Sequence, residues 1–278
     1  MTGVNWAAVA ASKYAVPEGL KPPDALNELL GMLASPDPEV RDTQAYSTLA
    51  LWTRAGHFDS VLRELGDQAA YELSHESVLV RSFSALILGE VIRRDRLASL
   101  LPGHLVALWA GCWARWYPQE PDVRSFEEGV GWIHAVAHGA DTAGELARHP
   151  HTSATDLRAI LSVLTERIRS LPLHLNQTED DRLALALLSV LSRPELSVEE
   201  LRRWLADYQT LWTTLEPGLI PPGAALGVRT FQGLHTLLHL GATLDGDALR
   251  PAYPAETLAA VQDALRTVYP YYGDGQTG

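Results

Sequence analysis

The sequence predicts an all-α protein built from stacked helix pairs, an α–α superhelix of the HEAT or armadillo repeat type. Long segments rich in Leu, Ala, Glu and Arg carry apolar residues at spacings of three and four, which is typical of amphipathic helices. Alternating β-branched runs are absent, and Pro and Gly cluster between the segments. We expect helices over 3–14, 24–34, 38–55, 58–73, 78–95, 102–116, 126–147, 155–170, 179–192, 198–213, 222–240 and 255–268.

A weak repeat favours stacked helix pairs in the first half of the chain. A Val-Arg step at Val40 recurs 40 residues later at Val80, and the tetrapeptide that begins at Val80 recurs 43 residues later at Val123. A period of roughly 40 to 47 residues is typical of HEAT and armadillo repeats. In such repeats we expect the Val to enter the core and the Arg to stabilise the turn before the helix. The competing interpretation is chance recurrence in a helical sequence rich in Leu and Ala.

Several of the expected helices carry recognisable start signals. Asp37-Pro38 combines an N-cap residue with a proline at the first helical position. Two later helices begin with capping-box spacing, Ser153 with Asp156 and Ser197 with Glu200. Thr178 can cap the helix over 179–192, whose first turn is acidic. No long polar linker divides the chain, so we expect one domain over 1–278, with 270–278 as a frayed tail.

Composition narrows the class of protein. The formal net charge is -12, and no basic block exceeds the Arg93-Arg94 pair, so we expect no binding to nucleic acid or to anionic membranes. No apolar run approaches the length of a membrane span, and the N-terminus does not read as a signal peptide. We therefore expect a cytoplasmic protein. The single cysteine, Cys112, lies among tryptophans and leucine and is expected to be an inert buried thiol.

Two aromatic stripes at helical spacing are interpreted mainly as core. Their alternative use is as a stacking platform for a base or a sugar, but packing in the core is the usual explanation for such spacing. The stripes are Trp109, Trp113 and Trp116, and then Trp204, Tyr208 and Trp212.

The segment from Trp132 to Asp141 is the main candidate for a functional site. On a helix, residues advance by about 100° each, so the polar side chains would share a stripe about 60° wide, with Trp132 on the opposite side. An interior glycine, Gly139, costs about 1 kcal/mol relative to alanine, which suggests that another backbone or a ligand comes close. The polar row is His134, His138, Asp141 and Glu145.

Three interpretations of this row stay open. His134, His138 and Asp141 could together bind a metal ion, although the His-Glu-x-x-His signature of zinc proteases is absent, since Ala135 follows His134. A polar pocket or a buried hydrogen-bond network is favoured over that metal site. A plain solvent-facing helix surface is the third interpretation. The sequence identifies no cofactor.

Other segments invite similar pairs of interpretations. His235 and His239 repeat the spacing of the first histidine pair; they could complete a four-histidine metal site or simply be core histidines. Asp180 and Arg182 lie at the start of a helix, where a structural role suffices. Alternatively they, like Arg124, could point into the groove that His134 and His138 line.

Four motifs together resemble a family of uncharacterised bacterial proteins that is defined only as a domain of unknown function. They are Val80-Arg-Ser-Phe-Ser-Ala-Leu86, Asp122-x-Arg124, Gly131-Trp-x-His-Ala-Val-Ala-His-Gly-Ala-Asp141 and Glu179-Asp-x-Arg-Leu183. The resemblance covers about residues 35 to 195, and the third motif is its specific part. Where the family usually has a glycine, Ser125 stands here, so the local turn can differ. The resemblance implies an all-helical, HEAT-like architecture and shared importance for Arg124, His134, His138, Asp141 and Arg182. It implies no reaction.

The leading functional hypothesis is a non-enzymatic binding protein whose concave groove takes a protein partner or a small polar ligand. A metal-dependent hydrolase with His134, His138 and Asp141 as ligands is the alternative, and a purely structural interaction module is the third. Whether the chain is an enzyme stays open at this point. The expected site consists of Arg124, Trp132, His134, His138, Asp141, Asp180 and Arg182.

Overall fold

The computed structural model describes residues 3–175, 177–214, 220–269 and 272. Most of these residues are helical, which confirms the all-α prediction, and strands occur within these ranges as two short hairpins. The chain forms two compact units, residues 1–152 and 153–278. A single domain over 1–278 stays a prediction, and the expected tail over 270–278 lies outside the described residues except for Tyr272.

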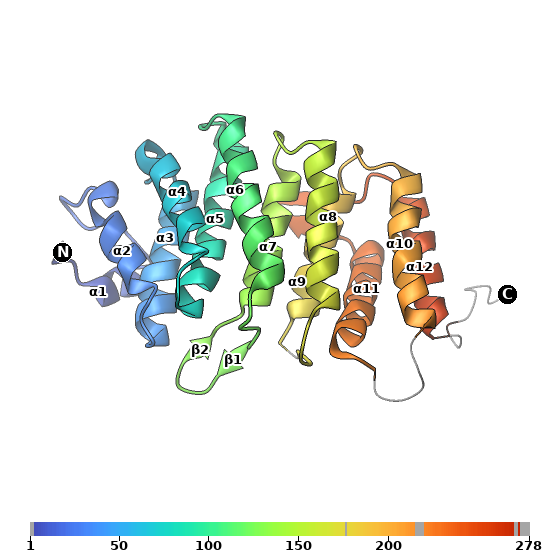
Figure 1. Ribbon diagram of the computed structural model, residues 1–278. Helices are drawn as coiled ribbons and strands as arrows, with labels where there is room; N and C mark the ends of the chain where they lie inside the picture. The colour runs from blue at the N-terminus through green and yellow to red at the C-terminus, as the bar shows by residue number, and fades with distance from the viewer. Residues whose placement is uncertain (1–2, 176, 215–219, 270–271, 273–278) are drawn as a thin grey trace. The chain divides into compact units, whose positions relative to one another are not determined.

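The helices of the first unit stack beside one another along the chain, and the unit ends in a hairpin and a final helix (Figure 1). Helix α5 is its centre, since it packs against α3, α4 and α7. Short 3-10 segments cover Pro22–Ala25, Asp59–Val61 and Tyr117–Gln119. The elements are α1 (Trp6–Ala11), α2 (Leu26–Met32), the π-helical η2 (Glu39–Tyr46), α3 (Ser47–Arg54), α4 (Leu62–Glu72), α5 (Val78–Ala98), α6 (Gly103–Trp116), β1 (Phe126–Glu127), β2 (Gly131–Trp132) and α7 (Ala135–Arg148).

The Val-Arg steps at the first two repeats play equivalent roles. Arg41 donates from Nη1 to the Ser35 carbonyl (3.2 Å), and Arg81 donates from Nη1 to the His75 carbonyl (2.7 Å). In both cases the carbonyl lies six residues earlier, in the turn before the helix. The expected turn-stabilising role of the arginine is therefore seen twice. The third step, at Arg124, leads into the hairpin instead of a helix.

The aromatic stripe of α6 belongs to the core, as the sequence predicts. Trp109 and Trp113 are fully buried. The ring of Trp109 lies so close to Gly66 that a Cβ there would come within 2.4 Å of it. Cys112 on the same helix is only half-buried, and its sulfur lies 3.3 Å from Nη2 of Arg115. The prediction of a buried thiol is wrong, because Cys112 lies at the edge of the tryptophan stripe, about 60° around the helix from Trp109.

The second unit pairs α9 with α11 and α10 with α12, and α11 also packs against α12. Both predicted capping boxes are present, at the starts of α8 and α10. Thr178 does not cap α9: it adopts a left-handed conformation (φ 64°) and makes no capping hydrogen bond. The elements are α8 (Ala154–Arg169), α9 (Glu179–Leu191), α10 (Val198–Thr213), α11 (Pro222–Leu240), β3 (Ala242–Leu244), β4 (Asp247–Leu249) and α12 (Pro254–Val268).

The helices of the described ranges are short or interrupted by polar residues. None of them is long and apolar enough to cross a membrane.

Candidate functional site

The segment from Trp132 to Asp141 does not form one helix. β1 and β2 pair antiparallel with Phe126 opposite Trp132, and α7 begins only at Ala135. The predicted helix over 126–147 is therefore wrong for residues 126–134. The physical reason is the glycine pair of the turn, since Gly129 and Gly131 both adopt φ of 84°, a conformation that interrupts a helix and suits glycine.

A buried arginine from a distant part of the sequence holds this hairpin in place. Arg41 is fully buried, and its Nη2 donates to the carbonyl of Val130 (2.8 Å) and to that of Trp132 (3.4 Å). A Cβ at Gly131 would come within 3.0 Å of Pro38 and 3.2 Å of the Arg41 guanidinium. The backbone of β2 thus lies directly against the turn that precedes η2.

His134 connects the hairpin to α7 in a strained conformation. Its φ of 51° and ψ of 28° place it in the left-handed region, outside the helix that it precedes. Its N–H donates to the carbonyls of Arg124 and Ser125, both at 3.2 Å. A left-handed conformation costs a residue with a side chain roughly 1–2 kcal/mol, and strain of this kind clusters at functional sites.

Five aromatic rings follow one another across the hairpin and into the core, and we call them the ring ladder. Its exposed end is the hairpin, where Phe126 and Trp132 are 53% and 39% exposed. Successive ring centroids lie 5.0, 4.6, 5.7 and 5.2 Å apart, and the 4.6 Å contact between Trp132 and His134 is stacked. The members in order are Phe126, Trp132, His134, His138 and Phe83.

The ring ladder corrects the predicted direction of Trp132. A helix would have placed Trp132 opposite His134, but the two rings stack because the chain turns between them. The predicted proximity of His134 and His138 is present, with the rings edge to face at 74°.

A buried hydrogen bond with Ser82 fixes the position of the His138 ring. It is 6% exposed, and its Nδ1 lies 2.7 Å from the Ser82 hydroxyl, which also bonds the Ile133 carbonyl. A carbonyl can only accept, so the single hydroxyl proton goes to Ile133 and Nδ1–H of His138 donates to Ser82. The neutral ring therefore carries its lone pair on Nε2.

The two acidic residues of the predicted row, Asp141 and Glu145, have different surroundings. Asp141 is half-buried and lies on α7, three residues after His138. Glu145 lies in an ion-pair cluster with Arg96 (3.5 Å) and with Arg148. The carboxylate of Glu145 is thus engaged by two arginines.

Arg124 lies on the hairpin side of the site and is bound by its own loop. Its guanidinium pairs with Asp122 (2.6 Å) and with Glu127. The hydrogen bond from Arg124, opposed by burial, lowers the pKa of Asp122 from its ordinary value. These contacts link the segment before β1 to Glu127 at the end of the strand, which makes Arg124 a stabilising residue of the hairpin.

Asp180 and Arg182 belong to the second unit, at the start of α9. The Asp180 carboxylate accepts from Nε of Arg229 at 2.9 Å, and the Arg182 side chain is exposed. Both positions are compatible with the structural role that the acidic first turn predicts.

The metal interpretation of the row gains no support from the geometry. Within 3–175, 177–214, 220–269 and 272, no group of three or more His, Cys, Asp or Glu side chains is placed to hold a metal ion. This includes His134, His138 and Asp141. Zinc sites in hydrolases use three protein ligands, so the hydrolase alternative stays a hypothesis that this geometry does not support.

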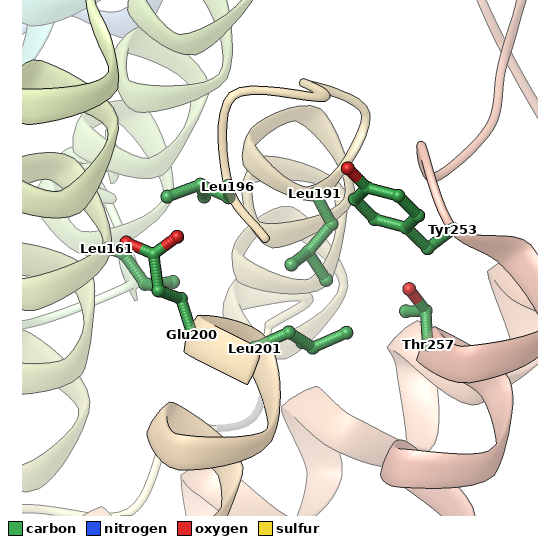
Figure 2. Close-up of a pocket in the computed structure, with 7 residues that line it drawn as sticks. All are labelled: Leu161, Leu191, Leu196, Glu200, Leu201, Tyr253 and Thr257. Atoms are coloured by element: carbon green, nitrogen blue, oxygen red, sulfur yellow. The ribbon is translucent and has the colours of Figure 1, made fainter. Parts of the chain in front are cut away.

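The second unit contains a small pocket that sequence reasoning did not single out (Figure 2). Its free space of about 10 Å³ is the volume that one water molecule needs. The carboxylate of Glu200 at the edge of the pocket accepts hydrogen bonds from Arg158 and Ser197, which together lower the pKa of Glu200 to about 2. The other lining residues are mostly apolar: Leu161, Leu191, Leu196, Leu201, Tyr253 and Thr257. This pocket therefore has room for about one water molecule between mostly apolar side chains.

Comparison with known proteins places this geometry in a family. A family model described as "Protein of unknown function (DUF2785)" matches residues 70–238. The chain belongs to DUF2785. The DUF2785 match contains the hairpin, α7 and the whole ring ladder, but Arg41, which holds the hairpin, lies before its first residue. No curated protein and no solved structure matches the chain.

Sequence reasoning missed Arg41 and Ser82, the two buried residues that support the site. The sequence contains a signal for both residues, since Ser82 and Arg41 each lie in or beside a repeated Val-Arg step. What the repeat could not indicate is that Arg41 bonds Val130, which is 89 residues away, and that Ser82 orients His138 within this DUF2785 chain.

Proposed function

We propose that this DUF2785 protein is a binding protein that takes a polar ligand or a protein partner at the face formed by Trp132, His134, His138 and Asp141. The observation that carries the proposal is the stacking of a strained histidine on a half-exposed tryptophan. We further propose that the face belongs to the concave groove of a HEAT-like repeat, and that the protein acts in the cytoplasm.

The exposed end of the ring ladder supports contact with another molecule. Phe126 and Trp132 expose large apolar surface on a hairpin that Arg41 braces from within. Large apolar side chains that stay exposed on a rigid support mark interaction sites, and tryptophan is among the residues that contribute most to binding. A braced hairpin loses little conformational entropy when a partner binds.

His134 and Asp141 are half-buried and would supply polarity to this face, and the buried ring of His138 lies 5.7 Å from that of His134. His134 is half-buried beside Trp132, and His138 is held in one tautomer by Ser82. Fixed hydrogen-bonding groups next to an aromatic surface are typical of sites that orient a polar ligand.

A nucleophilic enzyme is disfavoured at this face. Ser82 and His138 are within hydrogen-bond distance, as in a serine nucleophile and its base. However, Ser82 is fully buried and its proton is donated to the Ile133 carbonyl. The histidine donates to the serine, which is the reverse of the proton transfer that activation requires.

The proposal is tested with variants that keep the backbone intact. Trp132→Ala removes the exposed ring, and His134→Asn removes the imidazole with a residue that tolerates the left-handed conformation. Leu108→Ala is the matched control, because Leu108 is an exposed apolar residue of the same unit that lies outside the face.

Two kinds of partner are screened in parallel. Wild type and variants are compared by thermal shift against a panel of small carboxylates, phosphates and sugars, and as bait in pull-downs with quantitative mass spectrometry. We expect a ligand or partner that Leu108→Ala retains and both site variants lose. Hits that all four proteins share equally, or no hit in either screen, would contradict the proposal.

A further inference from the structure

The second histidine pair has a geometry that the first pair lacks. His235 and His239 lie one turn apart near the end of α11, and their Nε2 atoms are 3.1 Å from each other. Their ring centroids are 4.5 Å apart. His235 is half-buried and His239 is exposed, so both nitrogens meet at the surface of the second unit. In the first pair, by contrast, His134 stands outside the helix.

The distance between the two nitrogens is suitable for both to coordinate one metal ion. With metal–nitrogen bonds of about 2.0–2.1 Å, a gap of 3.1 Å between the nitrogens corresponds to an N–metal–N angle of about 98°. This angle lies between the roughly 90° of square-planar or octahedral coordination and the roughly 109° of a tetrahedron. Two histidines at i and i+4 on one helix face are also the spacing of the zinc-binding helix in metalloproteases.

We propose that His235 and His239 bind a divalent first-row transition-metal ion through their Nε2 atoms, with water in the remaining positions. Imidazole nitrogen suits Zn²⁺, Ni²⁺ and Cu²⁺, and Cu²⁺ binds tightest to a given set of ligands. The net charge of -12 further favours a cation.

Gln262 on α12 shows where a third ligand would stand. Its side-chain Nε2 lies 3.4 Å from Nε2 of His235. Glutamate has the same shape as glutamine, so Gln262→Glu would place a carboxylate oxygen at this distance. With metal bonds of about 2.0–2.2 Å, that spacing gives an angle near the tetrahedral value. The substitution therefore tests the position of the ion, not merely its presence.

Calorimetric titration of Zn²⁺ into the full-length protein measures the binding directly. We expect one site in the wild type, loss of that site in His239→Ala and in His235→Ala, and a lower Kd in Gln262→Glu. Thr236→Ala is the matched control, because Thr236 is an exposed residue of the same helix whose hydroxyl donates to the Gln232 carbonyl, and it should bind like the wild type. Far-UV circular dichroism confirms that each variant is folded.

A second readout identifies the ligands. Electron paramagnetic resonance of the protein loaded with one equivalent of Cu²⁺ should show two imidazole nitrogens, and His239→Ala should lose this signature. The proposal is overturned if the wild type binds no Zn²⁺, if both folded histidine variants keep the site, or if Gln262→Glu leaves the Kd unchanged.

Discussion

At the scale of single residues, packing in the core explains why a glycine, Gly139, occupies a position inside a helix. A Cβ at this position would lie 2.2 Å from two ring carbons of Tyr117. That tyrosine is fully buried, and its hydroxyl donates to the Val136 carbonyl at 2.6 Å. The close approach that the sequence predicts at Gly139 is therefore real, but the neighbour is an aromatic ring of the same unit, not a ligand.

We predict opposite effects of alanine at two helical glycines. Gly139→Ala should destabilise the protein by about 1–3 kcal/mol, because the added methyl overlaps the Tyr117 ring. Gly111→Ala should stabilise it by about 0.5–1 kcal/mol, because the new Cβ meets only the end of the Arg115 side chain at 3.6 Å. Urea unfolding of both variants gives the comparison. Equal effects would show that Tyr117 does not occupy the space above Gly139.

The residues of the candidate site differ in how far the sequence could predict them. His138 and Asp141 follow from helical spacing, because both lie within α7. Trp132 and His134 do not, because a reversal of the chain determines where their rings point. Local patterns record periodicity within an element, whereas the direction of a side chain at a junction depends on the element that follows.

At the scale of elements, a buried histidine joins the end of α7 to the end of α5. Nε2 of His149 lies 3.0 Å from the Asp95 carboxylate, and its Nδ1 accepts from the His151 N–H at 3.2 Å. Asp95 also accepts from the N–H groups of Leu100 and Leu101, both at 2.7 Å. Every contact is satisfied by a neutral His149 with its proton on Nε2.

This arrangement predicts a loss of stability in mild acid. Burial lowers the pKa of His149 from 6.5, although its hydrogen bond with Asp95 acts in the opposite direction. The unfolded chain therefore takes up the proton first as the pH falls. Stability that is present above pH 6.5 is lost as the pH falls below this value through the lower pKa of the folded state.

The variant His149→Gln should show a smaller drop in unfolding free energy between about pH 7.5 and about pH 5.5 than the wild type. Its amide can still donate to Asp95 but does not titrate. His104→Gln, at an exposed histidine of the same unit, is the control and should keep the wild-type drop. Urea unfolding at the two pH values measures both. An unchanged drop in His149→Gln would exclude this residue as the cause.

At the scale of the whole molecule, the charge balance predicts which partners are repelled. The formal net charge is -12, with a pI near 5.2. The protein therefore repels phosphate backbones and anionic lipid surfaces, which are also negatively charged. We predict no binding to a short duplex DNA or to phosphatidylserine vesicles even at about 50 mM salt, where electrostatic attraction would be strongest. Fluorescence anisotropy and vesicle sedimentation test this, and binding that weakens as salt rises would refute it.

The sequence by itself determined the helical class, the buried tryptophan stripe of α6, the two capping boxes and the helical part of the candidate site, because these follow from contacts within one or two turns. The tertiary structure decided the rest. The hairpin at 126–132 depends on Arg41, which is distant in sequence, and the ring of Tyr117 explains Gly139. Which histidine pair converges depends on whether both members share a helix, as His235 and His239 do. Such outcomes are set by long-range packing, whose energy no local pattern records.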